Sequence, residues 1–257
     1  MIFVFDLDGT ICFNGQPISK KILRSLVNLC NEGHEVIFAS ARPIRDMLPV
    51  IDEHFHHHPM IGGNGSLIAK DKKVVRSNAF STNELNEIKR LIEQYHATFL
   101  IDGEWDYAYT GSDTHPIRQN LDPARIAKMV NIDSLNPIVK VLLLSSDNME
   151  ELAEELLKLN VFLNKHRNEN VLDISPRGIN KWSSLMSLDL KESTFVAFGN
   201  DINDLPMFEK ALHTVMIGNH EQLFPLAKEV ISLNGDYEQK IADKIDELSK
   251  KYSKIEI

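Results

Sequence analysis

Two aspartates stand two residues apart near the N-terminus, in the stretch MIFVFDLDGT. The apolar run from Ile2 to Phe5 predicts a short strand that is buried on both faces. Side chains at i and i+2 of an extended segment point the same way, so Asp6 and Asp8 can converge on one site. Such a pair can supply a nucleophile, an acid and base, or metal ligands. Alone, the pair favours the simpler interpretation, a strand that ends in a polar turn, so the rest of the sequence has to decide.

Two more apolar runs end in polar residues of chemical interest. HEVIFAS ends at Ser40, with Arg42 close behind, and STFVAFGND leads into GNDIND. Lys181 follows a turn at residues 176–178. In a parallel sheet these strand ends share one edge, where open α/β sheets bind ligands. Two carboxylates, a hydroxyl, a lysine and an Asp/Asn cluster together fit Mg²⁺-dependent phosphoryl transfer to a carboxylate nucleophile.

The elements that must position these residues alternate between apolar strands and amphipathic helices. This pattern predicts an α/β fold with a doubly wound, mostly parallel, Rossmann-like sheet, formed by residues 1–79 and 175–257. Residues 80–174 differ in pattern and predict an inserted α+β unit, with three helices, one of them near 123–130, against antiparallel strands. Residues 221–227 predict a further short helix. Trp105, Tyr107 and Tyr109 alternate along one expected strand of this unit, so they either pack on its helices or contact a substrate.

The composition bounds the class of protein. The chain has 257 residues, 43% apolar and 25% charged, with a formal net charge of -9 and two cysteines. The negative charge argues against nucleic acid as a partner, and two cysteines suit a reducing compartment. No apolar stretch approaches the roughly 18 residues that span a bilayer, and no basic segment precedes the first apolar run. We therefore expect a cytoplasmic protein without membrane partners; the sequence carries no signal for an oligomeric state.

The motifs DLDGT, ASAR, GINK and GNDIND, in this order, resemble those of the haloacid dehalogenase-like hydrolases. The insertion resembles the cap of the Cof-type phosphatases in that superfamily. The resemblance implies that Asp6 attacks a phosphoryl group and that Asp8 protonates the leaving oxygen and then activates water. It further implies that Thr10 orders the turn, and that Ser40 and the backbone after it bind phosphate together with Lys181. Mg²⁺ would bind Asp6, the main-chain carbonyl of Asp8 and one group of GNDIND.

Two positions depart from the family pattern. Ala41 replaces the usual glycine of the hydroxyl motif, which matters only if the position needs a positive φ. Asn200 replaces the usual aspartate of the last motif and brings an oxygen ligand without charge. The third metal ligand is therefore Asn200, Asp201 or Asp204.

The resemblance leaves three lesser candidates and two rival functions. Asn64, in GGNGS, and Asn203 are candidates for substrate binding, although Asn203 and its neighbours also suit a helix N-cap. Arg42 either reaches the substrate or pairs with an acid on the cap. We expect a phosphatase that acts on a small phosphorylated metabolite, such as a sugar phosphate. The rivals are a phosphotransferase or mutase, and a phosphate sensor without turnover.

Overall fold

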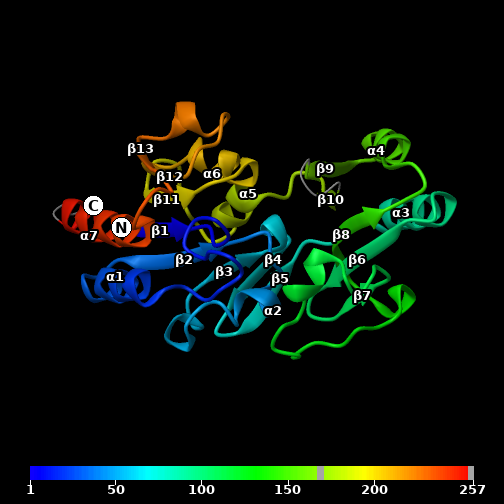
Figure 1. Cartoon of the computed structure of the whole chain (residues 1–257), viewed down its shortest axis with the longest axis horizontal. Helices are drawn as coiled ribbons and strands as arrows, with labels where there is room; N and C mark the ends of the chain where they lie inside the picture. Colours follow the sequence, from blue (N-terminus) through cyan, green and yellow to red (C-terminus); the bar gives the residue numbers. More distant parts are fainter. Residues whose placement is uncertain (167–170, 254–257) are drawn as a thin grey trace.

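The computed structural model describes residues 1–166 and 171–253, and its strands form two separate sheets (Figure 1). The larger one, here the core sheet, has the order β13-β12-β11-β1-β2-β3-β4-β5. Its strands are β1 (Ile2–Phe5), β2 (Glu35–Ala39), β3 (Met60–Gly62), β4 (Leu67–Lys70), β5 (Lys73–Ser77), β11 (Phe195–Gly199), β12 (His213–Ile217) and β13 (Glu229–Ile231). The pairs from β13 to β3 are parallel, and β4 and β5 add an antiparallel hairpin. The predicted doubly wound fold is confirmed.

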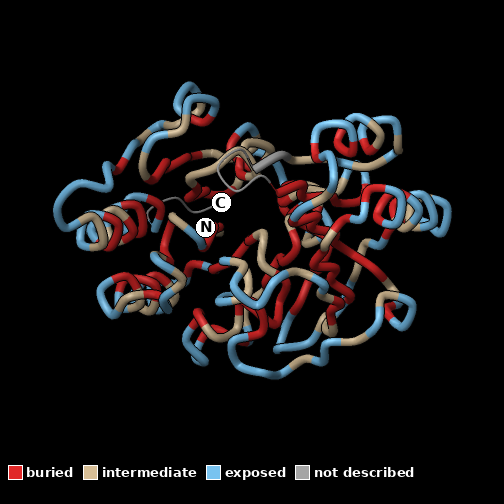
Figure 2. The backbone as a smooth tube through the Cα atoms, turned by 45° about the vertical axis from the view of Figure 1, so that its right-hand side comes forward, coloured by how far each residue is buried: buried red, intermediate tan, exposed pale blue. Residues whose placement is uncertain are grey.

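Helices cover both faces of the core sheet because its strands are apolar on both sides. Phe3 and Phe5 belong to the cluster that packs under α1 and α7, whereas Val4 points into the cluster under α5 and α6. Figure 2 shows the buried strands between helices whose outer sides are exposed. The helices of this part of the chain are α1 (Lys20–Asn31), α2 (Ile44–Met47), α5 (Lys181–Met186), α6 (Leu205–Phe208) and α7 (Tyr237–Tyr252).

The smaller sheet, here the cap sheet, is antiparallel and has the order β7-β6-β8-β10-β9. Its strands are β6 (Thr98–Gly103), β7 (Tyr107–Tyr109), β8 (Ile138–Ser145), β9 (Val161–His166) and β10 (Val171–Pro176). Two helices, α3 (Thr82–Gln94) and α4 (Met149–Leu157), pack on one face through a common apolar cluster. Ser81 and Glu84 form a capping box that starts α3, which fixes the first turn after the chain leaves the core.

Three expectations about local structure were wrong. Residues 123–130 form turns instead of a third cap helix, because Asp122 and Arg125 adopt positive φ angles of 44° and 52°. Residues 221–227 contain only a 3-10 turn, and Trp105 precedes β7 instead of lying on it. The 3-10 turns in the described part of the chain are η1 (Glu53–Phe55), η2 (Gly63–Gly65), η3 (Pro116–Gln119), η4 (Ile132–Ser134), η5 (Ile202–Asp204) and η6 (Phe224–Leu226).

The chain passes between the two sheets twice, once between Ser77 and Thr82 and again between Pro176 and Lys181. The predicted boundaries near residues 80 and 174 fall beside these two crossings, and they stay a prediction. The turn of the predicted pair formed by β9 and β10, residues 167–170, lies outside the described residues. Within the described ranges, no helix has the length and apolar character needed to cross a membrane.

Candidate active site

A cavity of about 340 Å³ lies between the carboxyl ends of the core strands and one face of the cap sheet. Eight of the residues predicted from the sequence line it: Asp6, Asp8, Ser40, Ala41, Arg42, Asn200, Asp201 and Asn203. The cap contributes Leu100, Asp102, Ile117, Asn120, Leu121, Lys140 and Leu142. The other four predicted residues, Thr10, Asn64, Lys181 and Asp204, lie outside this lining and contact residues that belong to it.

The carboxylate of Asp6 is held by two donors at the end of β1. Its Oδ1 accepts a hydrogen bond from Lys181 Nζ at 2.7 Å, and its Oδ2 accepts one from Thr10 Oγ1 at 2.8 Å. Asp6 is only 4% exposed, and its backbone N–H donates to the carbonyl of Phe198 on β11. The side chain therefore has one orientation, with its carboxylate in the cavity wall.

Lys181 places a single ammonium between two buried carboxylates. It is the first residue of α5, and its Nζ lies 2.6 Å from Asp204 Oδ1 as well as beside Asp6. The pKa of Asp6 is raised to about 7, chiefly by burial and then by the charge of Asp204, although Lys181 and Thr10 act to lower it. Burial disfavours the charged lysine, but Asp204 and Asp6 outweigh it and raise the pKa of Lys181. The single positive charge of Lys181 is thus shared between the carboxyl groups of Asp6 and Asp204.

Asp8 is paired with Arg42 across the mouth of the cavity. Arg42 Nε donates to Asp8 Oδ2 at 2.7 Å and Nη2 donates to Asp8 Oδ1 at 2.6 Å. The side chain of Asp8 is 49% exposed, in contrast to that of Asp6. The partner of Arg42 is therefore a core residue and not the cap acid that one of our alternatives expected, because the turn after β2 faces the turn after β1.

The turn after β2 presents the predicted phosphate-binding groups. Ser40 is 1% exposed, and its Oγ accepts from the N–H of Arg42 at 3.1 Å. Ala41 does not adopt a positive φ, so the backbone there makes no demand for glycine. The carbonyl of Ala41 accepts a hydrogen bond from Lys140 Nζ, on β8 of the cap, at 3.0 Å. The cap therefore touches this turn directly.

The three candidate metal ligands of the last motif differ in burial and in hydrogen-bond partners. Asp204 is fully buried, and its Oδ2 accepts from the N–H groups of Asn200 and Asp201 at 2.8 and 3.1 Å. The Oδ1 of Asn200 accepts from Thr10 Oγ1 at 3.1 Å. Asp201 caps η5 and also lines the cavity, so its capping role does not remove it from the candidate site. A Cβ at Gly9, where φ is +78°, would lie 2.2 Å from the Asn200 amide nitrogen, so only glycine fits there.

The donor set fits a magnesium ion. Asp6 and Asn200 both line the cavity, and each has a side-chain oxygen within hydrogen-bond distance of the Thr10 hydroxyl. The two candidate ligand residues therefore lie close together. Mg²⁺ takes one or two carboxylates and keeps several waters, which suits a set with few protein oxygens. In residues 1–166 and 171–253, no three His, Cys, Asp or Glu side chains group as ligands, so a site here depends on amide and main-chain oxygens too.

Asn203 and Asn64 connect the cavity to the cap. Asn203 Nδ2 donates to Asn64 Oδ1 at 3.0 Å, and Asn64 Nδ2 donates to Asp173 Oδ2, on β10, at 3.3 Å. Asn64 adopts a left-handed backbone with φ of 57°, which asparagine tolerates better than most residues. Of the two, only Asn203 lies in the cavity lining.

Sequence reasoning missed the charged residues that join core to cap. Arg45, whose side chain is fully buried, donates to Asp102 Oδ1 at 2.5 Å and to the carbonyl of Trp105 at 2.9 Å. The sequence did contain a signal for two of them. Asp102 and Lys140 interrupt apolar runs, and a buried charge there would be costly unless it were paired.

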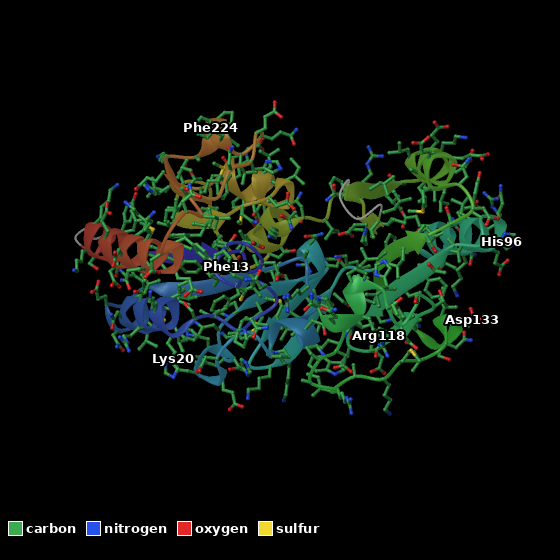
Figure 3. All side chains as sticks on the ribbon, viewed as in Figure 1. Phe13, Lys20, His96, Arg118, Asp133 and Phe224 are labelled. Carbon is green, nitrogen blue, oxygen red and sulfur yellow. The ribbon has the colours of Figure 1, made fainter. Side chains whose placement is uncertain are left out.

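Trp105, Tyr107 and Tyr109, the aromatic residues expected on one cap strand, lie outside the cavity lining. Arg45 stacks on the ring of Tyr107 at 4.8 Å, and Trp105 Nε1 donates to the carbonyl of Ile126. Arg118 lies over the ring of Tyr109 at 5.3 Å, and Figure 3 shows Arg118 nearer the core than Asp133 and His96. These contacts favour packing over substrate contact.

Comparison with known proteins gives one family and several relatives. The model of the haloacid dehalogenase-like hydrolase family matches residues 3–243. The chain is 23% identical over 233 residues to a 5-amino-6-(5-phospho-D-ribitylamino)uracil phosphatase of Bacillus subtilis, covering 85% of this chain and 86% of that protein. It is also 23% identical over 239 residues to an HMP-PP phosphatase of Yersinia enterocolitica, covering 84% and 82%.

Solved structures agree on the fold. A haloacid dehalogenase-like hydrolase from Bacteroides thetaiotaomicron superposes with a TM-score of 0.78 at 19% identity. The match covers 96% of this chain and 98% of that one, so it includes the cap as well as the core.

Proposed function

Because the chain belongs to the haloacid dehalogenase-like hydrolases, whose Cof-type members it resembles in motifs and cap, we propose that it is a Mg²⁺-dependent phosphatase. Its substrate is a small phosphorylated metabolite, a sugar phosphate or a similar compound, and Asp6 carries the phosphoryl group between two half-reactions. A cavity of about 340 Å³ lies at the small end of the range of ligand pockets, which runs from roughly 300 to 1,000 Å³. This size suits a metabolite better than a macromolecule.

The observation that carries the proposal is the contrast between the two aspartates. Asp6 is buried, held by Lys181 and Thr10, and so suits a nucleophile that must keep one position. Asp8 is half exposed, lines the cavity and is held by Arg42 instead, which suits a separate acid and base. A phosphate sensor without turnover needs no such second acid.

The chemistry balances with these two residues. In the first half-reaction a carboxylate oxygen of Asp6 bonds to phosphorus, the bond from phosphorus to the leaving oxygen breaks, and Asp8 gives that oxygen a proton. In the second, Asp8 takes a proton from water, the water oxygen bonds to phosphorus, and the bond to Asp6 breaks. Inorganic phosphate and the free alcohol are the products.

The remaining residues bind charge that develops on the transferring group. The Ser40 hydroxyl, the backbone after it and the Lys181 ammonium are the donors for the phosphoryl oxygens. Asp6, Asn200 and the main-chain carbonyl of Asp8 would hold Mg²⁺, with Asp201 nearby in the lining. When bound, the ion would neutralise phosphate charge and so allow a carboxylate to approach.

The test is phosphate release from p-nitrophenyl phosphate and a panel of phosphorylated metabolites, with Mg²⁺ and with EDTA. Wild type should release phosphate only with Mg²⁺, and Asp6→Asn should lose the activity. Asp52→Asn is the matched control, since it changes an exposed aspartate of the core outside the cavity and should keep full activity.

Other outcomes of the same test identify the rivals. Transfer of phosphate to an added sugar in place of water would indicate a phosphotransferase. A long-lived phosphorylated protein without phosphate release would indicate a sensor. Release by Asp6→Asn at the wild-type rate would contradict the proposal.

A further inference from the structure

The face of the cap sheet that closes the cavity carries two cross-strand pairs. Leu100 on β6 stands opposite Leu142 on β8, and Asp102 stands opposite Lys140. Directly opposed residues of an antiparallel pair share a face, and all four line the cavity. The residues between them, such as Ile101 and Val141, belong to the cluster under α3 and α4. The cap therefore offers the cavity one charged pair and one apolar pair.

The charged pair is engaged by the core. Asp102 accepts from Arg45, whose side chain is fully buried, and Lys140 donates to the carbonyl of Ala41. Lys140 Nζ also lies 3.1 Å from Asp173 Oδ2. Both side chains are at most 5% exposed. Their hydrogen bonds thus join the cap to the core, which leaves little capacity for a substrate.

The apolar pair remains for the leaving group. Leu100 and Leu142 are flanked in the lining by Ile117 and Leu121, from the segment that crosses this face of the sheet. Asn120 is the one uncharged polar side chain that the cap adds to the cavity lining within the described residues. A hydroxyl buried against leucine without a partner costs free energy, whereas an apolar ring gains by the same burial.

We propose that this site selects phosphate monoesters whose alcohol presents an apolar ring to Leu100 and Leu142, in preference to polyhydroxylated sugars. This inference rests on the proposed phosphatase function and narrows its substrate class. A sugar ring carries hydroxyls around its whole rim, and on the cap side of this cavity it finds mainly four aliphatic side chains. An apolar ring of the same size brings no hydroxyl of its own that would need a partner against these side chains.

The test compares cyclohexylmethyl phosphate with glucose 6-phosphate, which share a six-membered ring and a CH₂–O–phosphate linkage. Methyl phosphate is the third substrate, because it reports the chemistry without contacts to a ring. We expect kcat/KM to be at least about tenfold higher for cyclohexylmethyl phosphate than for the sugar ester. A smaller ratio, or one that favours the sugar, overturns the inference while hydrolysis of methyl phosphate keeps the proposed function. Failure of all three esters would contradict both.

A matched pair of variants locates the effect. Leu142→Asn should lower the cyclohexylmethyl-to-glucose ratio at least about fivefold, since its amide replaces apolar surface by donors and acceptors. Leu144→Asn is the control: it is two residues further on the same strand, 6% exposed and outside the cavity lining. It should keep the wild-type ratio. Equal ratios for both variants overturn the inference, and if neither variant folds, the wild-type ratio alone decides.

Discussion

Arg42 holds Asp8 by two parallel hydrogen bonds, of 2.7 and 2.6 Å, although the carboxylate is half exposed. Without a partner, an exposed aspartate samples several rotamers, and fixing one of them costs entropy. A guanidinium that binds both carboxylate oxygens removes this freedom and sets the direction of the carboxylate plane. Arg42 therefore acts as a positioning residue for the proposed acid and base.

Arg42→Lys and Arg42→Met should lower kcat in that order, by about tenfold and about 100-fold, with smaller changes in KM. Lysine can make one of the two bonds but cannot reproduce the fork. Steady-state kinetics on p-nitrophenyl phosphate and an alkyl ester checks this, with Arg90→Met on the exposed side of α3 as the control. The alkyl ester should suffer more, because its leaving group needs the proton. Wild-type kcat in both variants would show that Arg42 does not position Asp8.

Lys181→Met should both inactivate and destabilise the protein. Removal of the ammonium leaves Asp6 and Asp204 as neighbouring buried carboxylates without a counter-ion. We expect the free energy of unfolding to fall by about 3 kcal/mol and kcat/KM to fall at least about 100-fold. Urea unfolding and phosphate release measure the two effects.

The double variant Lys181→Met/Asp204→Asn separates those effects. An asparagine at 204 can still accept from the N–H groups of Asn200 and Asp201, while one of the two uncompensated charges disappears. Much of the lost stability should return and the activity should not. Activity that returned together with stability would contradict a direct role of Lys181 with phosphate.

The sequence was sufficient for the fold and for the residues at the core strand ends. Short apolar runs in the sequence identify β1, β2 and β11. Because these strands are parallel, the residues that follow them meet at one edge of the sheet. The site residues that follow these strands, Asp6, Ser40 and Asn200, were therefore accessible to local reasoning. Their individual roles stay predictions.

The cap half of the site was not accessible in the same way. Lys140 contacts Ala41, 99 positions away, and Asp102 contacts Arg45, 57 positions away. Which cap face meets the core depends on how the whole insertion docks, and no local pattern encodes that docking. The expected helix at 123–130 failed for a related reason, since this segment follows the surface of the cap sheet, with positive φ at Arg125 and at Asp122 just before it.

Asn200→Asp should strengthen Mg²⁺ binding. The substitution adds a full charge to an oxygen that already lies in the cavity lining. The Mg²⁺ concentration for the half-maximal rise in Tm should fall about tenfold, and the metal-free variant should melt below wild type because Asp6 is close. Thermal shift in the presence of EDTA and a Mg²⁺ series measures both. If the midpoint is unchanged and Asp201→Asn raises it, Asp201 is the ligand instead.

Asp46 should make the stability of the protein depend on pH. It lies at the wall of the cavity, 4% exposed, and its Oδ1 accepts from the N–H of Asp122 at 2.9 Å. The pKa of Asp46 is raised to about 7, chiefly by burial and also by Asp102, although Arg45, the N–H of Asp122 and Arg42 act to lower it. The folded protein thus binds a proton at Asp46 over a pH range in which the unfolded chain has already released it.

The sign follows from this difference in proton binding. Between the unfolded pKa near 4 and the folded pKa near 7, the native state holds more protons, so the free energy of unfolding falls as pH rises. Asp46→Asn keeps the acceptor for Asp122 and removes the titration. Relative to wild type, the variant should therefore gain stability from pH 4 to pH 7, by about 4 kcal/mol at roughly 1.4 kcal/mol per pKa unit, and no more above pH 8. Urea unfolding at pH 4.5, 6, 7.5 and 8.5 checks the slope. Two parallel curves would mean that Asp46 ionises equally in the folded and unfolded states, and that Arg45 and Arg42 together offset its burial.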